Sequence, residues 1–389
     1  MKDTVNRSRI NKSRFAVQSG LGLIELMIAM VVGLTLTAGV MQVYVANNQT
    51  ERVQEARARM QENGRFAINF LAREIRMAGF LGCLSSIDPN RINNTLNGAP
   101  ATFQPDKGVQ GWEAMHGNGT APGAIANSQN NLAPVNTDGG GWISSDGSVL
   151  DSTMALPASD IIKVWNSSGG GATINAVSGG AMTVVNSTIT DLADGDILLL
   201  SDCSSADWVQ ACNVQTISGG ASINSVLSAG CVPGNDVTKP LGTQSGGELV
   251  KLQGTSFYIG KRANNAANPP ALFRRRLSPT ATSGAAEELI EGIESLQVLY
   301  GVNLDNDNQK TVDAYVPANQ VTEWGLVVSV RISLLVQSIE DALLPTPQAY
   351  SFNGVTYDGS AGNGSLPADR RLRQTFTSTI TLRNRAVGR

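Results

Sequence analysis

The sequence predicts an α+β fold in which a long N-terminal helix packs on a C-terminal antiparallel β-sheet. Residues 21–46 carry one formal charge and are otherwise largely apolar. The following residues, to about 78, keep apolar side chains at three- and four-residue spacing, which is the helical period. Beyond residue 160, several stretches alternate apolar and polar side chains, as half-buried strands do. A helix followed by successive strands favours the α+β class.

The first 20 residues form a basic segment ahead of the apolar one. They contain five Lys and Arg residues against a single acid, Asp3. Positive charge before a span holds the N-terminus in the cytoplasm. We therefore predict four parts: a basic leader peptide at 1–20, a transmembrane helix at 21–46, its amphipathic continuation at 47–80, and a periplasmic β-rich head at 81–389.

The apolar segment has the features of a retained membrane span. About 20 apolar residues suffice to cross a bilayer, and Leu21 to Ala46 exceeds that length. A conventional signal peptide is cut after its apolar region, at small residues. Here the small residue, Gly20, precedes the apolar region. We expect a single-pass protein of the inner membrane with its head in the periplasm.

Glu25 places a carboxylate inside this apolar segment, which has no Lys or Arg to pair with it. Such a charge costs about 2.5–3.5 kcal/mol on insertion scales. Glu25 could lie at headgroup level or be tolerated in a marginal anchor. Alternatively, cleavage after Gly20 would create an α-amino group at Leu21. That amine would complement Glu25, either within one chain or between neighbours in an assembly.

The helix is predicted to continue to about residue 78 with one apolar stripe. Its members are Val53, Ala56, Met60, Gly64, Ala67, Leu71, Ile75 and Ala78. The stripe predicts that the upper helix packs against the head. Residues 84–160 are poor in periodicity and rich in Asn, Gly, Pro and Ser, and the stretch at 123–148 is interpreted as loop or weak β-structure. Strands are predicted at 160–165, 196–203, 293–302, 312–316, 324–338 and 373–385, with a strand pair or one bent strand at 248–260.

The four cysteines all follow the apolar segment and would therefore be exported. They are Cys83, Cys203, Cys212 and Cys231. An even number in an oxidising compartment favours two disulfides, with three connectivities open. We favour Cys83–Cys203, which would clamp the helix to the sheet, together with Cys212–Cys231, which would close a loop.

An acidic stretch after the strand at 293–302 resembles a calcium loop in its spacing. Asn303, Asp305, Asp307 and Asp313 place oxygen ligands at mostly alternate positions. No Gly occupies the sharp turn, where Asn308 would substitute, and no Glu closes the loop. A plain acidic hairpin turn is the alternative. No other cofactor is expected.

The sequence gives no support for an enzyme. His116 is the only histidine and lies in a Gly-rich stretch without a nucleophile-elbow sequence. The GGG runs at 139–141 and 169–171 lack the following Lys of a phosphate-binding loop. The basic cluster at 273–277 is predicted to be solvated or to form salt bridges between subunits. The net charge of -3 gives no basic excess, so nucleic acid is not predicted as a partner.

The stretch SGLGLIELMIAM resembles the class III signal of type IV pilins and type II secretion pseudopilins. The resemblance implies that a prepilin peptidase cleaves after Gly20, that Leu21 is N-methylated, and that Glu25 is the glutamate used in assembly. The chain departs from the usual pattern in having Leu rather than Phe after the cut. It also lacks a helix proline, which leaves Gly33 and Gly39 as points of flexibility.

Four further segments narrow the resemblance to the PilW family of minor pilins, which is similar to the J-type pseudopilins. They are LAREIRMAGFLGC, GIESLQVLYGVNLDND, EWGLVVSVRISLLVQS and RRLRQTFTSTITLRNR. This resemblance implies a tip complex that primes fibre assembly, and ties the chain to fimbrium biogenesis, twitching motility and cell adhesion. Implied partners are other minor pilins, the major pilin, the prepilin peptidase and the inner-membrane assembly platform. The implied final location is the pilus fibre or tip.

Two other functions stay open. A J-type pseudopilin of a type II secretion system would share the same N-terminal chemistry. A membrane-anchored periplasmic enzyme or carbohydrate-binding module would explain the large Gly- and Asn-rich head. An anchored enzyme would tolerate loss of Glu25, whereas a pilin or pseudopilin would fail to assemble.

Overall fold

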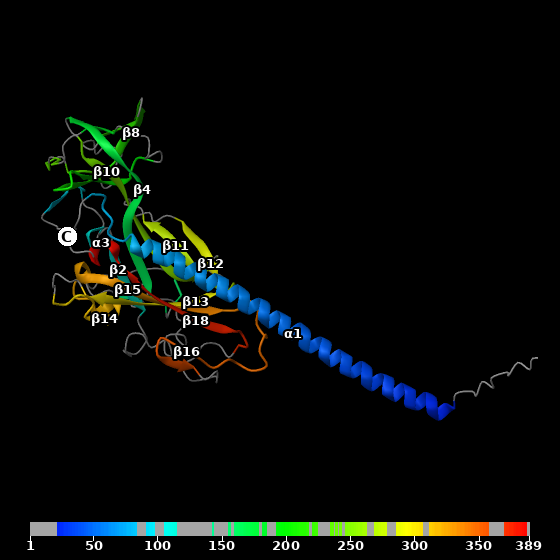
Figure 1. The fold of residues 1–389 in the computed structure, drawn as a ribbon. Helices are drawn as coiled ribbons and strands as arrows, with labels where there is room; N and C mark the ends of the chain where they lie inside the picture. The colour runs from blue at the N-terminus through cyan, green and yellow to red at the C-terminus, as the bar shows by residue number, and fades with distance from the viewer. Residues whose placement is uncertain are drawn as a thin grey trace, which may run out of the picture. The chain divides into compact units, whose positions relative to one another are not determined.

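The structure is a computed structural model of the chain, and it describes parts of residues 22–386. The described residues are 22–83, 91–97, 105–114, 142–143, 155–156, 159–178, 181–184, 192–217, 220–224, 234–236, 238–239, 241–242, 246–262, 268–277, 285–305, 311–357 and 369–386. The chain divides into two compact units, Met1–Val53 and Gln54–Arg389. Figure 1 shows the ribbon.

Helix α1 (Leu23–Arg76) is continuous over 54 residues, which agrees closely with the helix predicted from about 21 to 78. In the first unit it is apolar, and it is the one candidate membrane span among the described residues. None of the side chains in its most apolar stretch is buried. A helix that is apolar on all sides needs lipid or other helices around it.

In the second unit, α1 buries one face. Its buried residues are Met60, Gly64, Ala67, Leu71, Ala72 and Ile75, so the predicted stripe is the packing face. Gly64 lies so close to Phe376 that a Cβ would overlap with the aromatic ring. Phe70 meets Phe257 edge-on at 6.0 Å between ring centroids. The helix therefore packs against strands that are far apart in the sequence.

The described part of the head contains two large sheets and one two-stranded hairpin. The larger has twelve strands, and eight of them follow the order β1-β7-β6-β10-β4-β5-β9-β8. Its strands are β1 (Ile92–Asn94), β2 (Val109–Ala114), β3 (Trp142–Ile143), β4 (Ile161–Ser178), β5 (Ala181–Val184), β6 (Ile197–Ser201), β7 (Ala206–Gln210), β8 (Cys212–Ile217), β9 (Gly220–Asn224), β10 (Glu248–Lys261), β11 (Pro270–Leu277) and β12 (Ala286–Glu291).

The smaller sheet has four strands in the order β14-β13-β15-β18, all antiparallel. They are β13 (Ile293–Val302), β14 (Ala314–Val316), β15 (Val327–Gln337) and β18 (Arg373–Thr381). A separate hairpin joins β16 (Tyr350–Phe352) to β17 (Val355–Tyr357), and a short helix α3 (Arg383–Ala386) follows β18. In Figure 1, β13, β15 and β18 run side by side.

The structure confirms the α+β fold class of one N-terminal helix and an antiparallel sheet. It also decides between the alternatives at 248–260, because β10 is one strand with a register irregularity between Leu249 and Lys251. Sequence analysis predicts no strand at 109–114, where β2 lies. All six residues of β2 are buried, and it pairs with β4 through Trp112 opposite Ile161.

Candidate functional site

The first candidate site is the start of helix α1. Glu25 lies in the first turn, and its Oε2 accepts a hydrogen bond from the backbone N–H of Gly22 at 3.3 Å. A carboxylate here is stabilised by the unpaired N–H groups and the dipole of the helix N-terminus. Glu25 thus turns toward the N-terminal end of the described helix. Gly20 and Leu21 are outside the described residues.

The exposed apolar surface of α1 is the second part of this site. Large side chains with more than half of their surface exposed surround the helix: Leu23, Ile24, Leu26, Met27, Ile28, Met30, Val31, Val32, Leu34, Leu36, Val40, Met41, Val43, Tyr44 and Val45. Such a surface suits burial in lipid or among similar helices. It cannot form the core of a water-soluble domain while it stays exposed.

A disulfide joins Cys83, just after α1, to Cys203, just after β6. This is the favoured pairing that was predicted to clamp the helix to the sheet. Cys212 is also disulfide-bonded, and Cys231, its expected partner, lies outside the described residues.

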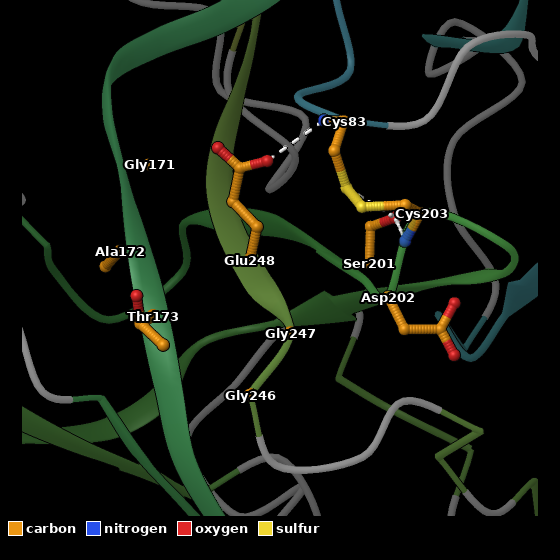
Figure 2. A pocket seen from close by; sticks show the side chains of 10 residues that line it. All are labelled: Cys83, Gly171, Ala172, Thr173, Ser201, Asp202, Cys203, Gly246, Gly247 and Glu248. Atoms are coloured by element: carbon orange, nitrogen blue, oxygen red, sulfur yellow. Dashed lines mark hydrogen bonds between the residues drawn. A yellow bond between two sulfur atoms is a disulfide. The ribbon is translucent and has the colours of Figure 1, made fainter.

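The Cys83–Cys203 disulfide lines a pocket of about 530 Å³, shown in Figure 2. Glu248 points toward Cys83, and its Oε2 accepts a hydrogen bond from the Cys83 N–H at 2.9 Å. A Cβ at either Gly82 or Gly171 would overlap with this carboxylate. Both glycines therefore make room for Glu248 to hold the segment at the end of α1. The GGG run at 169–171 lies within strand β4.

Asp160 joins the two sheets. Its Oδ1 accepts the N–H of Ala114, in β2 of the larger sheet, at 3.0 Å, and its Oδ2 accepts the N–H of Val298, in β13 of the smaller sheet, at 2.8 Å. The Asp160 N–H donates to the Leu296 carbonyl. Asp160 is 2 % exposed, and burial raises its pKa to about 7.

Tyr300 lies near this carboxyl group and directly over Gly111. A Cβ at position 111 would collide with the Tyr300 hydroxyl. Its ring meets Trp324 edge-on at 4.9 Å. Burial raises the pKa of Tyr300, and the nearby carboxyl groups of Asp160 and Glu113 raise it further. All three side chains are buried, so a substrate has no route to them. We interpret this cluster as structural.

Sequence reasoning missed a buried lysine. Lys163 is 0 % exposed, and its Nζ lies 4.6 Å from the ring centroid of Trp112 and 5.6 Å from that of Trp165. Both are cation–π distances. The sequence offered one indication of this contact. Lys163 and Trp165 are two residues apart on one strand, so their side chains lie on the same face of the sheet.

The predicted calcium residues are partly described. Asp313 Oδ2 accepts the N–H of Leu304 at 2.7 Å and that of Asp305 at 3.4 Å, so this carboxylate binds the backbone that directly follows β13. Asn303 is buried, and its N–H donates to the Leu326 carbonyl. Asp307 and Asn308 lie outside the described residues, as does His116. Within the described ranges no cluster of three or more His, Cys, Asp or Glu side chains is placed to hold a metal ion, and calcium stays a prediction.

The basic cluster at 273–277 is part of strand β11. Arg274 forms a bidentate ion pair with Glu287 of the neighbouring strand β12 at 2.7 and 3.0 Å. Arg274 therefore forms an ion pair within the chain, and the predicted solvated or intersubunit role of the cluster stays a prediction.

Sequence reasoning also missed a buried ion-pair cluster at the start of β18. Arg373 bonds both oxygens of Glu294 and both of Asp369 at 2.6–3.1 Å. Its side chain is only 2 % exposed. Burial raises the pKa of Glu294, and Arg373 opposes that shift. This cluster ties β18 to the start of β13.

Comparison with known families finds one match: residues 256–384 match PilW, the type IV pilus-assembly protein W family. The matched range runs from the middle of β10 to α3, about a third of the chain, and contains the four-stranded sheet. Comparison with curated proteins and with solved structures finds no match. The family match supports a protein related to type IV pilus assembly, and the apolar N-terminal helix is consistent with a membrane-anchored one.

Proposed function

We propose that this chain is a minor pilin that primes type IV pilus assembly in a tip complex with other minor pilins. The observation that carries the proposal is the pairing of two features in one chain. An exposed apolar helix starts with a carboxylate turned to its N-terminus, and the head contains a match to a pilus-assembly family. Neither an anchored enzyme nor a binding module requires the first feature.

The proposed mechanism begins in the inner membrane. A prepilin peptidase cleaves after Gly20, and Leu21 becomes the N-methylated first residue. The apolar part of α1 waits in lipid, where Glu25 neutralises a positive N-terminus. Extraction then exchanges lipid contacts for contacts with the helices of other pilins, and Glu25 pairs with the α-amino group of its own chain or of a neighbour. The assembly platform and the major pilin complete the fibre.

The first experiment is mass spectrometry of the chain from its native cell, with and without the prepilin peptidase. The proposal expects a mature chain that begins at methylated Leu21 only when the peptidase is present. A chain that still begins at Met1, or one cut beyond Ala46, contradicts it.

The second experiment replaces one carboxylate at a time on the same helix. Glu25→Gln should abolish surface pili while leaving the chain in the membrane, because a neutral side chain cannot pair with the amine. Glu51→Gln is the matched control, since Glu51 is also exposed on α1 but lies outside the predicted span. Normal piliation with Glu25→Gln would exclude the assembly role.

A J-type pseudopilin would pass the first test, because its N-terminal processing is the same, but Glu25→Gln would then block protein secretion and leave surface pili intact. Deletion of the gene separates the two machines, because a minor pilin deletion removes pili and a pseudopilin deletion blocks protein secretion instead.

A further inference from the structure

Strand β18 is an edge of the four-stranded sheet, and among the described residues it pairs only with β15. In an antiparallel pair, alternate residues direct both backbone groups toward the partner strand and the others direct both away. The N–H of Leu382 donates to the Val328 carbonyl at 2.9 Å. Even-numbered residues of β18 therefore bond to β15, and odd-numbered residues point their N–H and C=O groups outward.

The first outward position confirms this direction. The Arg373 N–H donates to Gln348 Oε1 at 2.7 Å, and Gln348 Nε2 donates to the Arg373 carbonyl at 3.0 Å. A single amide side chain thus makes the pair of hydrogen bonds that a neighbouring strand would make. Gln348 occupies the first position of a backbone ladder on the outer edge of β18.

The next four outward positions are all threonines: Thr375, Thr377, Thr379 and Thr381. Their side chains are exposed, and their outward peptide groups form no hydrogen bond with any other described residue. The hydroxyl groups of Thr377 and Thr379 bond to Ser333 and Arg331 of β15. The opposite face of the strand, with Phe376, packs toward α1.

Edges that resist strand addition carry charges, proline or a covering element. In the described part of the chain, Gln348 bonds to the outer edge of β18 at Arg373, and β16 approaches the same end, with the Tyr350 ring centroid 5.7 Å from the Arg373 guanidinium. No charged residue or proline lies between Arg373 and Arg383. Strand β12, which pairs only with β11 in the described part of the chain, differs sharply. It carries Glu287, Glu288 and Glu291.

We propose that the outer edge of β18 binds an extended segment of a partner protein by β-strand addition, and that this segment carries acidic residues at its two ends. An extended backbone is the ligand whose N–H and C=O spacing matches the four outward threonines. The acidic ends follow from the charges that flank the edge. Arg370 and Arg383 are exposed at its two ends. Neither forms a salt bridge with a described residue. Asp341 nevertheless lies near Arg370: its Oδ1 accepts the Arg370 N–H at 2.9 Å, and the Arg370 charge helps to lower the pKa of Asp341.

The same charges argue against a second copy of this chain as the occupant. An antiparallel pair of β18 strands would place Arg370 of each copy near Arg383 of the other. A parallel pair would place each arginine near its own counterpart. Like charges at opposed positions are destabilising in either arrangement.

The test uses the full chain in detergent and a fluorescent peptide as long as β18, made of alternating Thr and Val with Glu at both ends. Binding is measured by fluorescence anisotropy, and backbone amide exchange at Thr375, Thr377, Thr379 and Thr381 is followed by mass spectrometry. We expect saturable binding with slowed exchange at these positions. Replacing the terminal Glu residues by Lys should weaken binding about tenfold or more.

Two variants at one position test the backbone ladder. Thr377→Pro removes an outward N–H and keeps the backbone hydrogen bonds to β15, because proline is tolerated at edge positions that face away from the ladder. It loses the hydroxyl contact with Ser333, and Thr377→Val loses the same contact, so the two variants differ in the backbone N–H. It should weaken peptide binding about tenfold or more. Thr377→Val keeps the N–H and should bind within about twofold of the unchanged chain. Unchanged denaturation midpoints would show that both variants fold.

The proposal is overturned if the peptide fails to bind, if both Thr377 variants bind equally well, or if the Lys-ended peptide binds as tightly as the Glu-ended one. It is also overturned if the chain dimerises and Thr377→Pro abolishes the dimer, because a second copy would then be the occupant. These outcomes leave the cleavage test at Gly20 unaffected, so this inference and the pilin proposal fail separately.

Discussion

Gly64 of helix α1 lies directly against the aromatic ring of Phe376 in strand β18. The contact joins the buried face of the helix to the edge strand of the four-stranded sheet. A helix can approach a sheet this closely only where it has no Cβ in the way. The position therefore sets how the upper half of α1 packs on the head.

We predict that Gly64→Ala destabilises the chain, although alanine is a better helix former by about 1 kcal/mol. Overpacking a tight contact costs about 1–3 kcal/mol, so the net effect should be a loss measurable by urea denaturation of the detergent-solubilised chain. Gly39→Ala is the control, because nothing lies within 4 Å of a Cβ there. Adding Phe376→Leu to Gly64→Ala should recover stability, and a double variant no better than the single one would contradict the packing explanation.

The Arg373 cluster gives a second prediction. Arg373→Met should cost about 3–5 kcal/mol, because it leaves Glu294 and Asp369 without their buried cation. Arg262→Met is the matched control, since Arg262 also makes a bidentate pair, with Glu288, but is 69 % exposed. An exposed pair should contribute less than about 1 kcal/mol.

The loss in Arg373→Met should shrink as the pH falls. Without the guanidinium, the burial that raises the pKa of Glu294 is unopposed, and protonation removes the buried charge. Denaturation midpoints of the two chains should therefore converge toward acid. A difference that stays constant with pH would mean that lost packing, not charge, causes the effect.

Asp160 predicts a pH dependence of stability. Its pKa is about 7 in the folded chain against an ordinary value of 3.8. The folded state therefore holds a proton that the unfolded state releases, and the stabilisation is complete below about pH 4 and is lost as the pH rises to about 7. At about 1.4 kcal/mol per pKa unit, the loss is of the order of 4 kcal/mol.

Asp160→Asn should flatten this pH profile, whatever its effect on absolute stability, and denaturation at several pH values measures the slope. Asp202→Asn is the control. Hydrogen bonds from Ser204 and Ser205 lower the pKa of Asp202 to about 2, so its stabilisation is lost only below about pH 4. An unchanged slope in Asp160→Asn would exclude Asp160 as the titrating group.

The Cys83–Cys203 disulfide closes a loop with a sequence separation of 120. Replacing both cysteines by alanine should cost about 2–4 kcal/mol, mainly because the unfolded chain gains freedom. Glu248→Gln offers a comparison, since it keeps the disulfide and weakens only the hydrogen bond to the Cys83 N–H. Glu248→Gln should lower the free energy of unfolding less than the double cysteine replacement does. A larger loss in Glu248→Gln would mean that the carboxylate, and not the disulfide, contributes most of the stability.

Sequence reasoning succeeded where one pattern determines one element. The apolar stripe on α1 and the alternation in β15 depend on single faces that pack on the head, so the helix and the strands of the smaller sheet could be predicted. It failed at β2, where Gln110 and Glu113 are buried along with the apolar residues. Their burial depends on pairing with β4, which is distant in the sequence and leaves no local pattern.

The candidate site shows the same difference between local features and contacts of residues that are distant in the sequence. The position of Glu25 is a local feature and could be read from the helix it begins. The contacts of Asp160 to Val298 and of Arg373 to Glu294 join residues that are far apart in the chain. Their side chains look like ordinary surface charges in the sequence, because only the fold buries them. The free edge of β18 likewise emerges only when the strand order is known.

If the chain enters a pilus as proposed, the place of Cys83 has a mechanical consequence. Cys83 follows the end of α1 closely and is bonded covalently to Cys203, beyond β6. A pulling force carried along α1 would pass through this sulfur bridge into the larger sheet, and the hydrogen bonds of the intervening strands would bear less of it. The chain between the two cysteines, which are 120 residues apart in the sequence, would then carry little of the force.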